Sequence, residues 1–349
     1  MNEMRVLEAL RAGRAVRRPP RGRRRAAHSV DTASVAGHRV HRLSSHAHDL
    51  HATFVPGAAM LGLSMRHRGE ELLGLPHDLE AYVRTGAATG IPLLHPWANR
   101  IDGFRYTAAG RSVDLAAATD VLQLDDGGLP IHGVVGGRPG FRVLRAVAAE
   151  TGAHLAAELD YGSRPALLAA FPYPHRLRVE VTVRGPRLTI RTTVAAAAVP
   201  VPIAFGHHPY LRIPGASRAE WHVALPARTR LALDARGLPT GGREALPAER
   251  APLGERVFDD LFEVGAAPVE LAVAGAGREL GVRFDAGYPY AQVFAPAGAG
   301  FICFEPMTAP VDALRSGDGV RLAPPGTAFR AEWSLEVRNA GAGAGTVGA

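Results

Sequence analysis

Apolar and polar residues alternate on both sides of a Gly-Pro turn in residues 177–194, and this pattern constrains the fold of the chain more than any other feature. Apolar side chains occupy every second position from Leu177 to Val183, Gly185-Pro186 interrupts the run, and the alternation resumes at Leu188. Successive side chains of a strand point to opposite faces, so the pattern predicts a hairpin with one buried face. The 40 glycines and 27 prolines of the 349 residues also disfavour an all-helical fold.

Short segments of the same kind recur along most of the chain, separated by Gly, Pro and Asp, and helical periodicity is scarce. Strands are expected at 52–66, 142–160, 220–234, 269–273, 279–284, 290–295, 300–305 and 329–338. Many strands without alternating helices predict an all-β, antiparallel sandwich with few short helices rather than a βαβ fold. We expect one large domain over residues 35–338.

The positive charge of the chain is confined to its N-terminal end. Residues 1–25 contain nine arginines and two glutamates, which together account for the whole formal net charge of +7. We therefore expect residues 1–34 to be a disordered Arg/Pro-rich tail, and Gly/Ala-rich residues 339–349 a second disordered tail. With no export-type or membrane-spanning apolar run, the interpretation is a cytoplasmic protein without a membrane or specific nucleic-acid partner.

The chain has a single cysteine, Cys303, which cannot form an internal disulfide and belongs to no CxxC pair. A zinc or redox site built on cysteines is therefore not expected, and a reducing compartment fits best.

Glu305 is the most informative ionisable residue, because it directly follows the apolar segment Phe301–Phe304 and is itself followed by Pro306. The segment is apolar on both faces of the expected strand, so the carboxylate is predicted to point inward. A buried carboxylate costs several kcal/mol unless partners or a function compensate it. The alternatives are a structural ion pair with an arginine or a place in a ligand pocket.

Three other ionisable residues lie in apolar segments bounded by turns, which adds weight to the pocket hypothesis. They are Arg100, His132 and His208. His207 and His208 are neighbours at an expected strand end, so they point to opposite sides and only one can face a given site. A zinc site from His132, one of this pair and Glu305 is a weaker alternative, since no short chelating motif is present.

Six short motifs, taken in order, resemble the aldose 1-epimerase (galactose mutarotase) family over roughly residues 50–337. They are Asn99-Arg100-Ile101, Ile131-His132-Gly133, His208-Pro209-Tyr210, Leu238-Pro239-Thr240-Gly241, Asp259-Asp260-Leu261-Phe262 and Glu305-Pro306-Met307-Thr308. No single motif is specific, but the order and spacing of all six are. The resemblance implies a large antiparallel β-supersandwich.

The resemblance also implies roles for individual residues. Glu305 would be the general base, His208 the general acid and His132 a second histidine near the ring oxygen, while Arg100 and Asp259 would bind sugar hydroxyls. Asn99 matches the residue beside that arginine and would line the site. Separately from the resemblance, the aromatic ring of Tyr210 or Trp97 could support a sugar face, with core packing as the alternative for each.

Interconverting the anomers of a sugar needs a base at the C1 hydroxyl and an acid at the ring oxygen, and it needs no metal, redox centre or nucleotide. We therefore expect an isomerase with no cofactor, acting on a free hexose as a monomer or homodimer. The alternatives are a mutarotase for phosphorylated or sulfonated hexoses, using arginines such as Arg66, Arg138, Arg164 or Arg212, and a non-enzymatic sugar-binding protein. A carbohydrate lyase or hydrolase is a weaker option.

Overall fold

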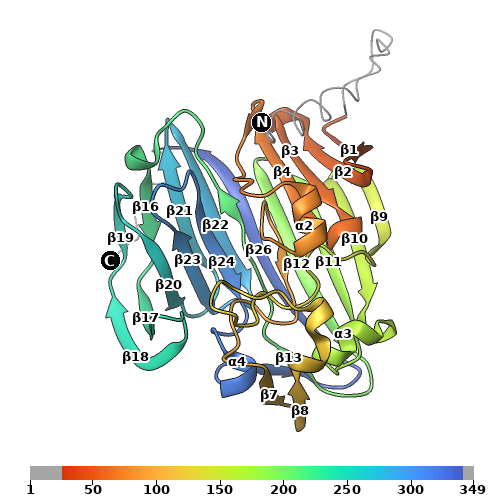
Figure 1. Cartoon of the computed structure of the whole chain (residues 1–349). Coiled ribbons are helices and arrows are strands. Elements are labelled where there is room, and N and C mark those ends of the chain that lie inside the picture. The colour runs from red at the N-terminus through yellow and green to blue at the C-terminus, as the bar shows by residue number, and fades with distance from the viewer. Residues whose placement is uncertain (1–25, 341–349) are drawn as a thin grey trace.

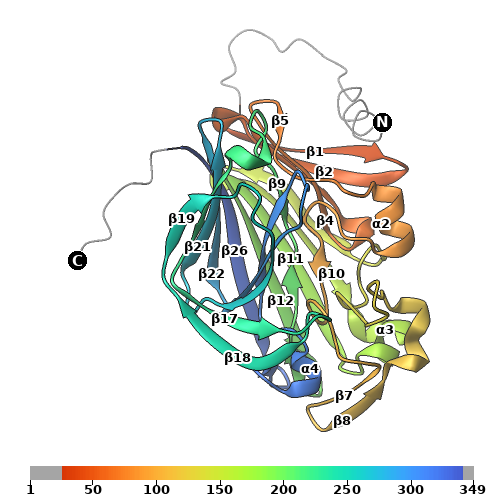
Figure 2. The same cartoon turned by 60° about the vertical axis from the view of Figure 1, so that its left-hand side comes forward.

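The computed structural model describes residues 26–340, so most of both predicted tails lies outside the described residues. The named strands pair antiparallel, as the alternating sequence pattern predicts. Within residues 26–340 the strands form three sheets of five, eight and nine strands and two two-stranded ribbons, whose arrangement is seen in Figures 1 and 2.

The largest sheet has nine strands in the spatial order β19-β16-β21-β22-β26-β12-β11-β10-β9. Their bounds are β19 (Glu249–Pro252), β16 (His222–Leu225), β21 (Val269–Gly275), β22 (Arg278–Ala286), β26 (Ala328–Asn339), β12 (Arg187–Ala196), β11 (His175–Arg184), β10 (Gly152–Asp160) and β9 (Arg142–Ala149). The predicted hairpin is confirmed as β11 and β12, and Gly185 at its turn has a φ of 61° that favours glycine.

The eight-stranded sheet holds the segments that the sequence marks as candidate site residues. Seven strands follow the order β18-β17-β20-β23-β24-β14-β6, and β15 pairs with β24 off this path. Their bounds are β18 (Pro239–Leu246), β17 (Arg228–Leu233), β20 (Phe258–Glu263), β23 (Tyr290–Ala295), β24 (Ile302–Met307), β14 (Gly206–His207), β6 (Leu93–Leu94) and β15 (Tyr210–Leu211).

The third sheet has five strands in sequence order, and helix α2 (Leu79–Thr85) packs against it through a small apolar cluster that includes Leu79 and Tyr82 (Figures 1 and 2). The strands are β1 (His28–Val35), β2 (His38–Ser45), β3 (Leu50–Val55), β4 (Leu61–His67) and β5 (Glu70–Glu71). Asp78 begins α2 by accepting a hydrogen bond from the Ala81 amide, and Gly86 ends it in the left-handed conformation.

The remaining elements are short. The two ribbons are β7 (Arg105–Ala108) with β8 (Arg111–Asp114), and β13 (Val201–Ile203) with β25 (Arg321–Ala323). The other helices are α3 (Pro165–Ala170) and α4 (Ala313–Ser316), with 3₁₀ turns η1 (His46–His48), η2 (Pro56–Ala58), η3 (Leu115–Val121), η4 (Tyr161–Ser163) and η5 (Arg218–Glu220). Helix α4 lies beside the β7–β8 ribbon at one end of the molecule in both views (Figures 1 and 2).

One large apolar cluster connects the sheets and includes Trp97, Phe205, Phe284 and Trp333, all buried. Trp97 therefore packs in the core rather than against a ligand, which decides between its two predicted roles. None of the described helices is both long and apolar enough to cross a bilayer.

The predicted domain bounds need correction at the N-terminal end. The tail was predicted to extend to residue 34, but His28–Val35 form β1 and pair along their whole length with β2. Four consecutive residues of β1 are exposed, so its polar composition reflects a solvent-facing strand rather than disorder. At the other end, β26 continues to Asn339, one residue beyond the predicted domain.

Candidate active site

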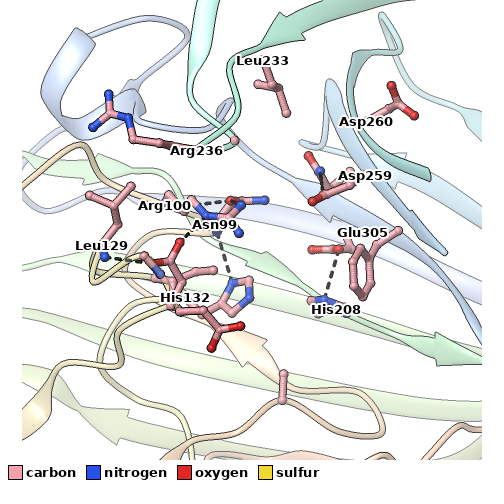
Figure 3. Close-up of a pocket in the computed structure, with 18 of the residues that line it drawn as sticks. Asn99, Arg100, Leu129, His132, His208, Leu233, Arg236, Asp259, Asp260 and Glu305 are labelled. Carbon is pink, nitrogen blue, oxygen red and sulfur yellow. Dashed lines mark hydrogen bonds and ion pairs between the residues drawn. The ribbon is translucent and has the colours of Figure 1, made fainter. Parts of the chain in front are cut away.

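One cavity of about 910 Å³ is lined by all seven residues that the sequence singles out. They are Asn99, Arg100, His132, His208, Tyr210, Asp259 and Glu305. Strands β20 and β24 carry the two carboxylates, whereas Asn99, Arg100 and His132 come from loops between short elements. Figure 3 shows the loop residues across the cavity from Glu305 and Asp259.

Glu305 and His208 form a buried pair at one side of this cavity. His208 Nε2 lies 3.2 Å from Glu305 Oε1, and the residues are 5% and 1% exposed (Figure 3). Glu305 Oε2 has no hydrogen-bond partner among the described residues, so it can accept a hydrogen bond from a ligand hydroxyl. The neighbouring His207 points the other way, where its Nε2 contacts the Thr192 hydroxyl at 3.0 Å.

Burial favours the neutral form of both Glu305 and His208. Burial raises the pKa of Glu305 well above its ordinary value; the charge of Asp259 adds to this effect and that of Arg100 opposes it. Burial also lowers the pKa of His208 well below its ordinary value, with a further contribution from His132. The shared proton is therefore favoured on the carboxyl group, although the mutual attraction of the two groups alone would favour a charged pair.

His132 has one tautomer that its surroundings define. The backbone N–H of Asn99 donates a hydrogen bond to His132 Nδ1 over 3.3 Å, so the ring proton of a neutral His132 is on Nε2. Burial, with a further contribution from Arg100, lowers the pKa of His132 to about 3. Its ring meets that of His208 edge to face at 5.5 Å between centroids. His132 is thus a neutral hydrogen-bond donor beside the Glu305–His208 pair.

The backbone that holds His132 is unusual. Asn99 and His132 have positive φ angles of 57° and 62°. The backbone N–H of His132 donates a hydrogen bond to the backbone carbonyl of Asn99. Gly133 follows at a φ of 73°, where a Cβ would lie 2.2 Å from the carbonyl oxygen of His95. The glycine in the Ile131-His132-Gly133 motif is therefore required by close backbone packing.

Arg100 is held by two side chains. Its Nε donates to Asp125 Oδ2 over 2.6 Å, and its Nη1 donates to Asn99 Oδ1 over 3.3 Å. Burial alone would raise the pKa of Asp125, but the hydrogen bond from Arg100, with those from the turn amides, lowers it overall. Asp125 is not recognisable as a site residue from the sequence, because Asp125-Asp126-Gly127-Gly128 has the composition of an ordinary turn.

Asp259 accepts a hydrogen bond from Gln292 Nε2 over 2.7 Å. Gln292 is 1% exposed and lies directly opposite Glu305 in the register of β23 and β24. It was also missed, although a polar residue within the otherwise apolar strand β23 was an available signal. Asp260, the next residue in the same motif, also lines the cavity and pairs with Arg230 at 3.9 Å.

The aromatic ring of Tyr210 packs against the imidazole of His208. The two rings stack at 4.4 Å between centroids with 10° between their planes, and Phe301 contacts Tyr210 edge to face at 4.9 Å. Tyr210 is buried, so its ring supports the imidazole on one side. A metal centre has no support here, because the described residues contain no group of three or more His, Cys, Asp or Glu side chains arranged to hold an ion.

The fold and the site together define a class of protein, an antiparallel β-sandwich with a buried Glu–His pair at the wall of a polar cavity. The model of the aldose 1-epimerase family matches residues 43–336, and the chain is a member of that family. The resemblance stated from the six motifs is thereby confirmed. No curated protein sequence matches the chain.

Solved structures agree with the fold at low sequence identity. A galactose mutarotase-like protein from Clostridium acetobutylicum has a TM-score of 0.75 and 17% identity, over 89% of this chain and 98% of that one. A protein from Synechocystis sp. PCC 6803 has a TM-score of 0.69 and 22% identity, over 86% and 96%. A galactose 1-epimerase from Lactobacillus acidophilus NCFM has a TM-score of 0.69 and 13% identity, over 90% and 99%. The predicted galactose mutarotase-like fold class is confirmed.

Proposed function

We propose that this protein is an aldose 1-epimerase that interconverts the α and β anomers of a neutral hexose. The observation that carries the proposal is the buried contact of 3.2 Å between His208 Nε2 and Glu305 Oε1 at the wall of the cavity. One proton shared between a carboxyl group and an imidazole supplies one acid and one base, as ring opening requires.

In the proposed reaction Glu305 removes the proton of the C1 hydroxyl while His208 protonates the ring oxygen as the bond between C1 and that oxygen breaks. The product is the open-chain aldehyde. Rotation about the C1–C2 bond and reversal of both proton transfers close the ring on the other face. The pair then has its original protons, so no co-reactant is consumed.

The remaining residues suit the binding of hydroxyl groups. His132 offers an Nε2–H, Arg100 offers guanidinium N–H groups, and Asp259 offers a carboxylate held by Gln292. Together they provide donors and acceptors for several hydroxyls of one sugar ring. Tyr210, predicted to contact the sugar, lines the cavity, and its stacked ring holds the imidazole of His208 in place.

The charges in the cavity favour a neutral substrate over a phosphorylated or sulfonated one. Its three arginines each have a carboxylate partner: Arg100 pairs with Asp125, Arg230 with Glu244, and Arg236 with Asp102. Asp259, Asp260 and Glu305 add further acidic groups to the wall. None of Arg66, Arg138, Arg164 and Arg212, which the sequence offered as anion-binding candidates, lines this cavity.

Polarimetry of freshly dissolved α-D-glucose and α-D-galactose at neutral pH tests the proposal. We expect the wild-type protein to accelerate mutarotation and Glu305→Gln to lower turnover by at least about 10²-fold with its fold intact. Activity limited to hexose phosphates would favour the anionic-substrate alternative. Sugar binding without acceleration of any sugar would instead identify a binding protein.

A further inference from the structure

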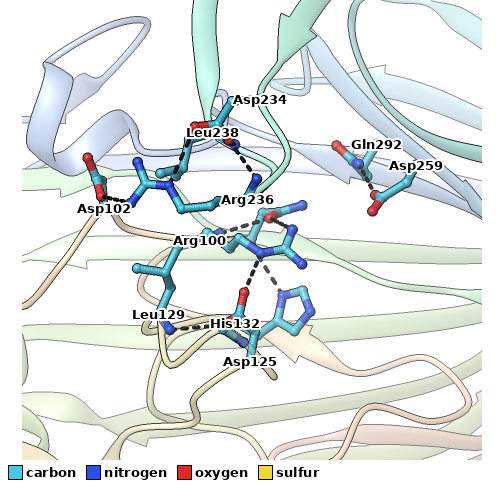
Figure 4. Close-up of polar contacts among 12 residues, drawn as sticks. Arg100, Asp102, Asp125, Leu129, His132, Asp234, Arg236, Leu238, Asp259 and Gln292 are labelled. Atoms are coloured by element: carbon cyan, nitrogen blue, oxygen red, sulfur yellow. Dashed lines mark hydrogen bonds and ion pairs between the residues drawn. The ribbon is translucent and has the colours of Figure 1, made fainter.

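The Asp125 carboxylate is fixed by its own turn before it meets Arg100. Its Oδ1 accepts hydrogen bonds from the Gly127 and Leu129 amides over 2.9 and 2.8 Å, while its Oδ2 accepts from Arg100 Nε over 2.6 Å (Figure 4). The Asp125 side chain is 13% exposed and that of Arg100 is 20% exposed. The geometry of the turn therefore determines where the guanidinium group lies.

The other sides of Arg100 are also confined. Asn99 Oδ1 accepts from Nη1 over 3.3 Å, and a Cβ on Gly237 would lie 2.6 Å from the same nitrogen. The loop with Gly237 is in turn held by an ion pair of 3.0 Å between Arg236 and Asp102 (Figure 4). The hydrogen bonds from the guanidinium group to described residues use Nε and Nη1, so Nη2 remains available for a ligand.

We propose that Asp125 is a positioning residue, which orients Arg100 toward a sugar hydroxyl and neutralises its charge so that the cavity does not act as an anion site. This inference rests on the proposed mutarotase function. Asp125 acts through Arg100 and does not itself touch the sugar. A charge-assisted hydrogen bond in a partly buried site is stronger and more directional than a neutral one, which suits it to this task.

The expected consequence extends to the base. Arg100 carries a positive charge that lowers the pKa of Glu305, and Asp125 offsets part of that charge. Removing the Asp125 charge exposes Glu305 to the full field of Arg100. The acid limb of the pH profile for kcat/KM is then expected to move to lower pH, an effect that a merely structural role would not produce.

The test compares Asp125→Asn with Asp126→Asn as a matched control. Asp126 is the next residue, is exposed, borders the same cavity, and makes no side-chain hydrogen bond or ion pair to a described residue, so both variants lose one carboxylate from the same turn and only Asp125 contacts Arg100. We expect Asp125→Asn to reduce kcat/KM for α-D-galactose about 10- to 100-fold, mainly through KM, and to move the acid limb. Asp126→Asn should change KM less than about twofold and leave the limb in place. Asp125→Glu should recover part of the loss.

A double-mutant cycle with Arg100→Met separates positioning from general support of the fold. If Asp125 acts through Arg100, Asp125→Asn adds little to the KM of the Arg100→Met protein. Equal losses in both backgrounds, or a response of Asp125→Asn matching that of Asp126→Asn, would overturn the inference while leaving the mutarotase function intact. A wild-type protein that accelerates no hexose would overturn both. Should Asp125→Asn fail to fold, Asp125→Glu measured in the two Arg100 backgrounds gives the same cycle.

Discussion

Replacing His207 by Gln is expected to make the protein less sensitive to acid. His207 is 2% exposed, its Nε2 contacts the Thr192 hydroxyl, and its ring packs near Trp333 at 5.6 Å between centroids. Burial lowers the pKa of His207 from 6.5 to about 3. The unfolded chain therefore binds a proton below pH 6.5 that the folded protein does not bind until pH approaches 3, so acidification destabilises the fold.

The magnitude follows from the width of that interval. At pH 5 the unfolded histidine is 1.5 pH units below its pKa of 6.5, and each unit corresponds to about 1.36 kcal/mol. His207 alone should then reduce the free energy of unfolding by about 2 kcal/mol at pH 5, a large fraction of a typical total of about 5–15 kcal/mol. Gln has a similar size and can hydrogen-bond Thr192, but it does not titrate.

The assay is urea unfolding of the wild-type protein and His207→Gln at pH 7 and pH 5. The wild type should lose about 2 kcal/mol more than the variant between the two pH values, with similar m-values. His222→Gln is the control, because His222 is exposed on β16 and the same substitution there should leave the pH dependence unchanged. Equal pH dependence in the wild type and His207→Gln would refute the role of burial at this site.

Three further changes test other parts of the site. His208→Asn should lower turnover at least about 10²-fold while the thermal unfolding midpoint stays close to that of the wild type, as polarimetry and calorimetry would show. Tyr210→Leu should lower kcat about 10-fold because His208 loses its stacking partner, whereas Tyr210→Phe, which keeps the ring, should stay within about threefold of the wild type. Gly133→Ala should destabilise the fold by about 3 kcal/mol or more in urea unfolding, because its Cβ would lie 2.2 Å from the His95 carbonyl oxygen; an unchanged midpoint would contradict that packing.

The strands could be predicted well where side chains alternate, because burial of one face imposes a period of two on the sequence. The hairpin of β11 and β12 and the bounds of β23 follow directly from that pattern. The expected strand at 52–66 is instead two strands, β3 and β4, with a 3₁₀ turn between them. Its apolar character continues through the turn, since Pro56 and Ala58 are themselves buried, so hydrophobicity alone could not show the reversal.

The candidate site could be predicted as a set of residues but not as a network. Glu305 and His208 are conspicuous because a buried ionisable group interrupts an apolar segment. Asp125 and Gln292 act on other polar groups across sheet and loop contacts that only the folded chain brings together. Carboxylates in turns and amides in strands are common in proteins, so the local sequence does not predict that Asp125 contacts Arg100 or that Gln292 contacts Asp259.

The effect of burial on the Glu305–His208 pair bears directly on the proposed chemistry. A raised pKa makes Glu305 a stronger base once ionised, and a lowered pKa makes protonated His208 a stronger acid. A C1 hydroxyl that donates to the unpartnered Oε2 would stabilise the carboxylate and favour the proton on His208. Ring opening then returns the pair to a carboxylic acid and a neutral imidazole, the distribution that burial already favours. The same desolvation that opposes a charged pair in the cavity therefore favours both proton transfers in the direction of the open-chain sugar.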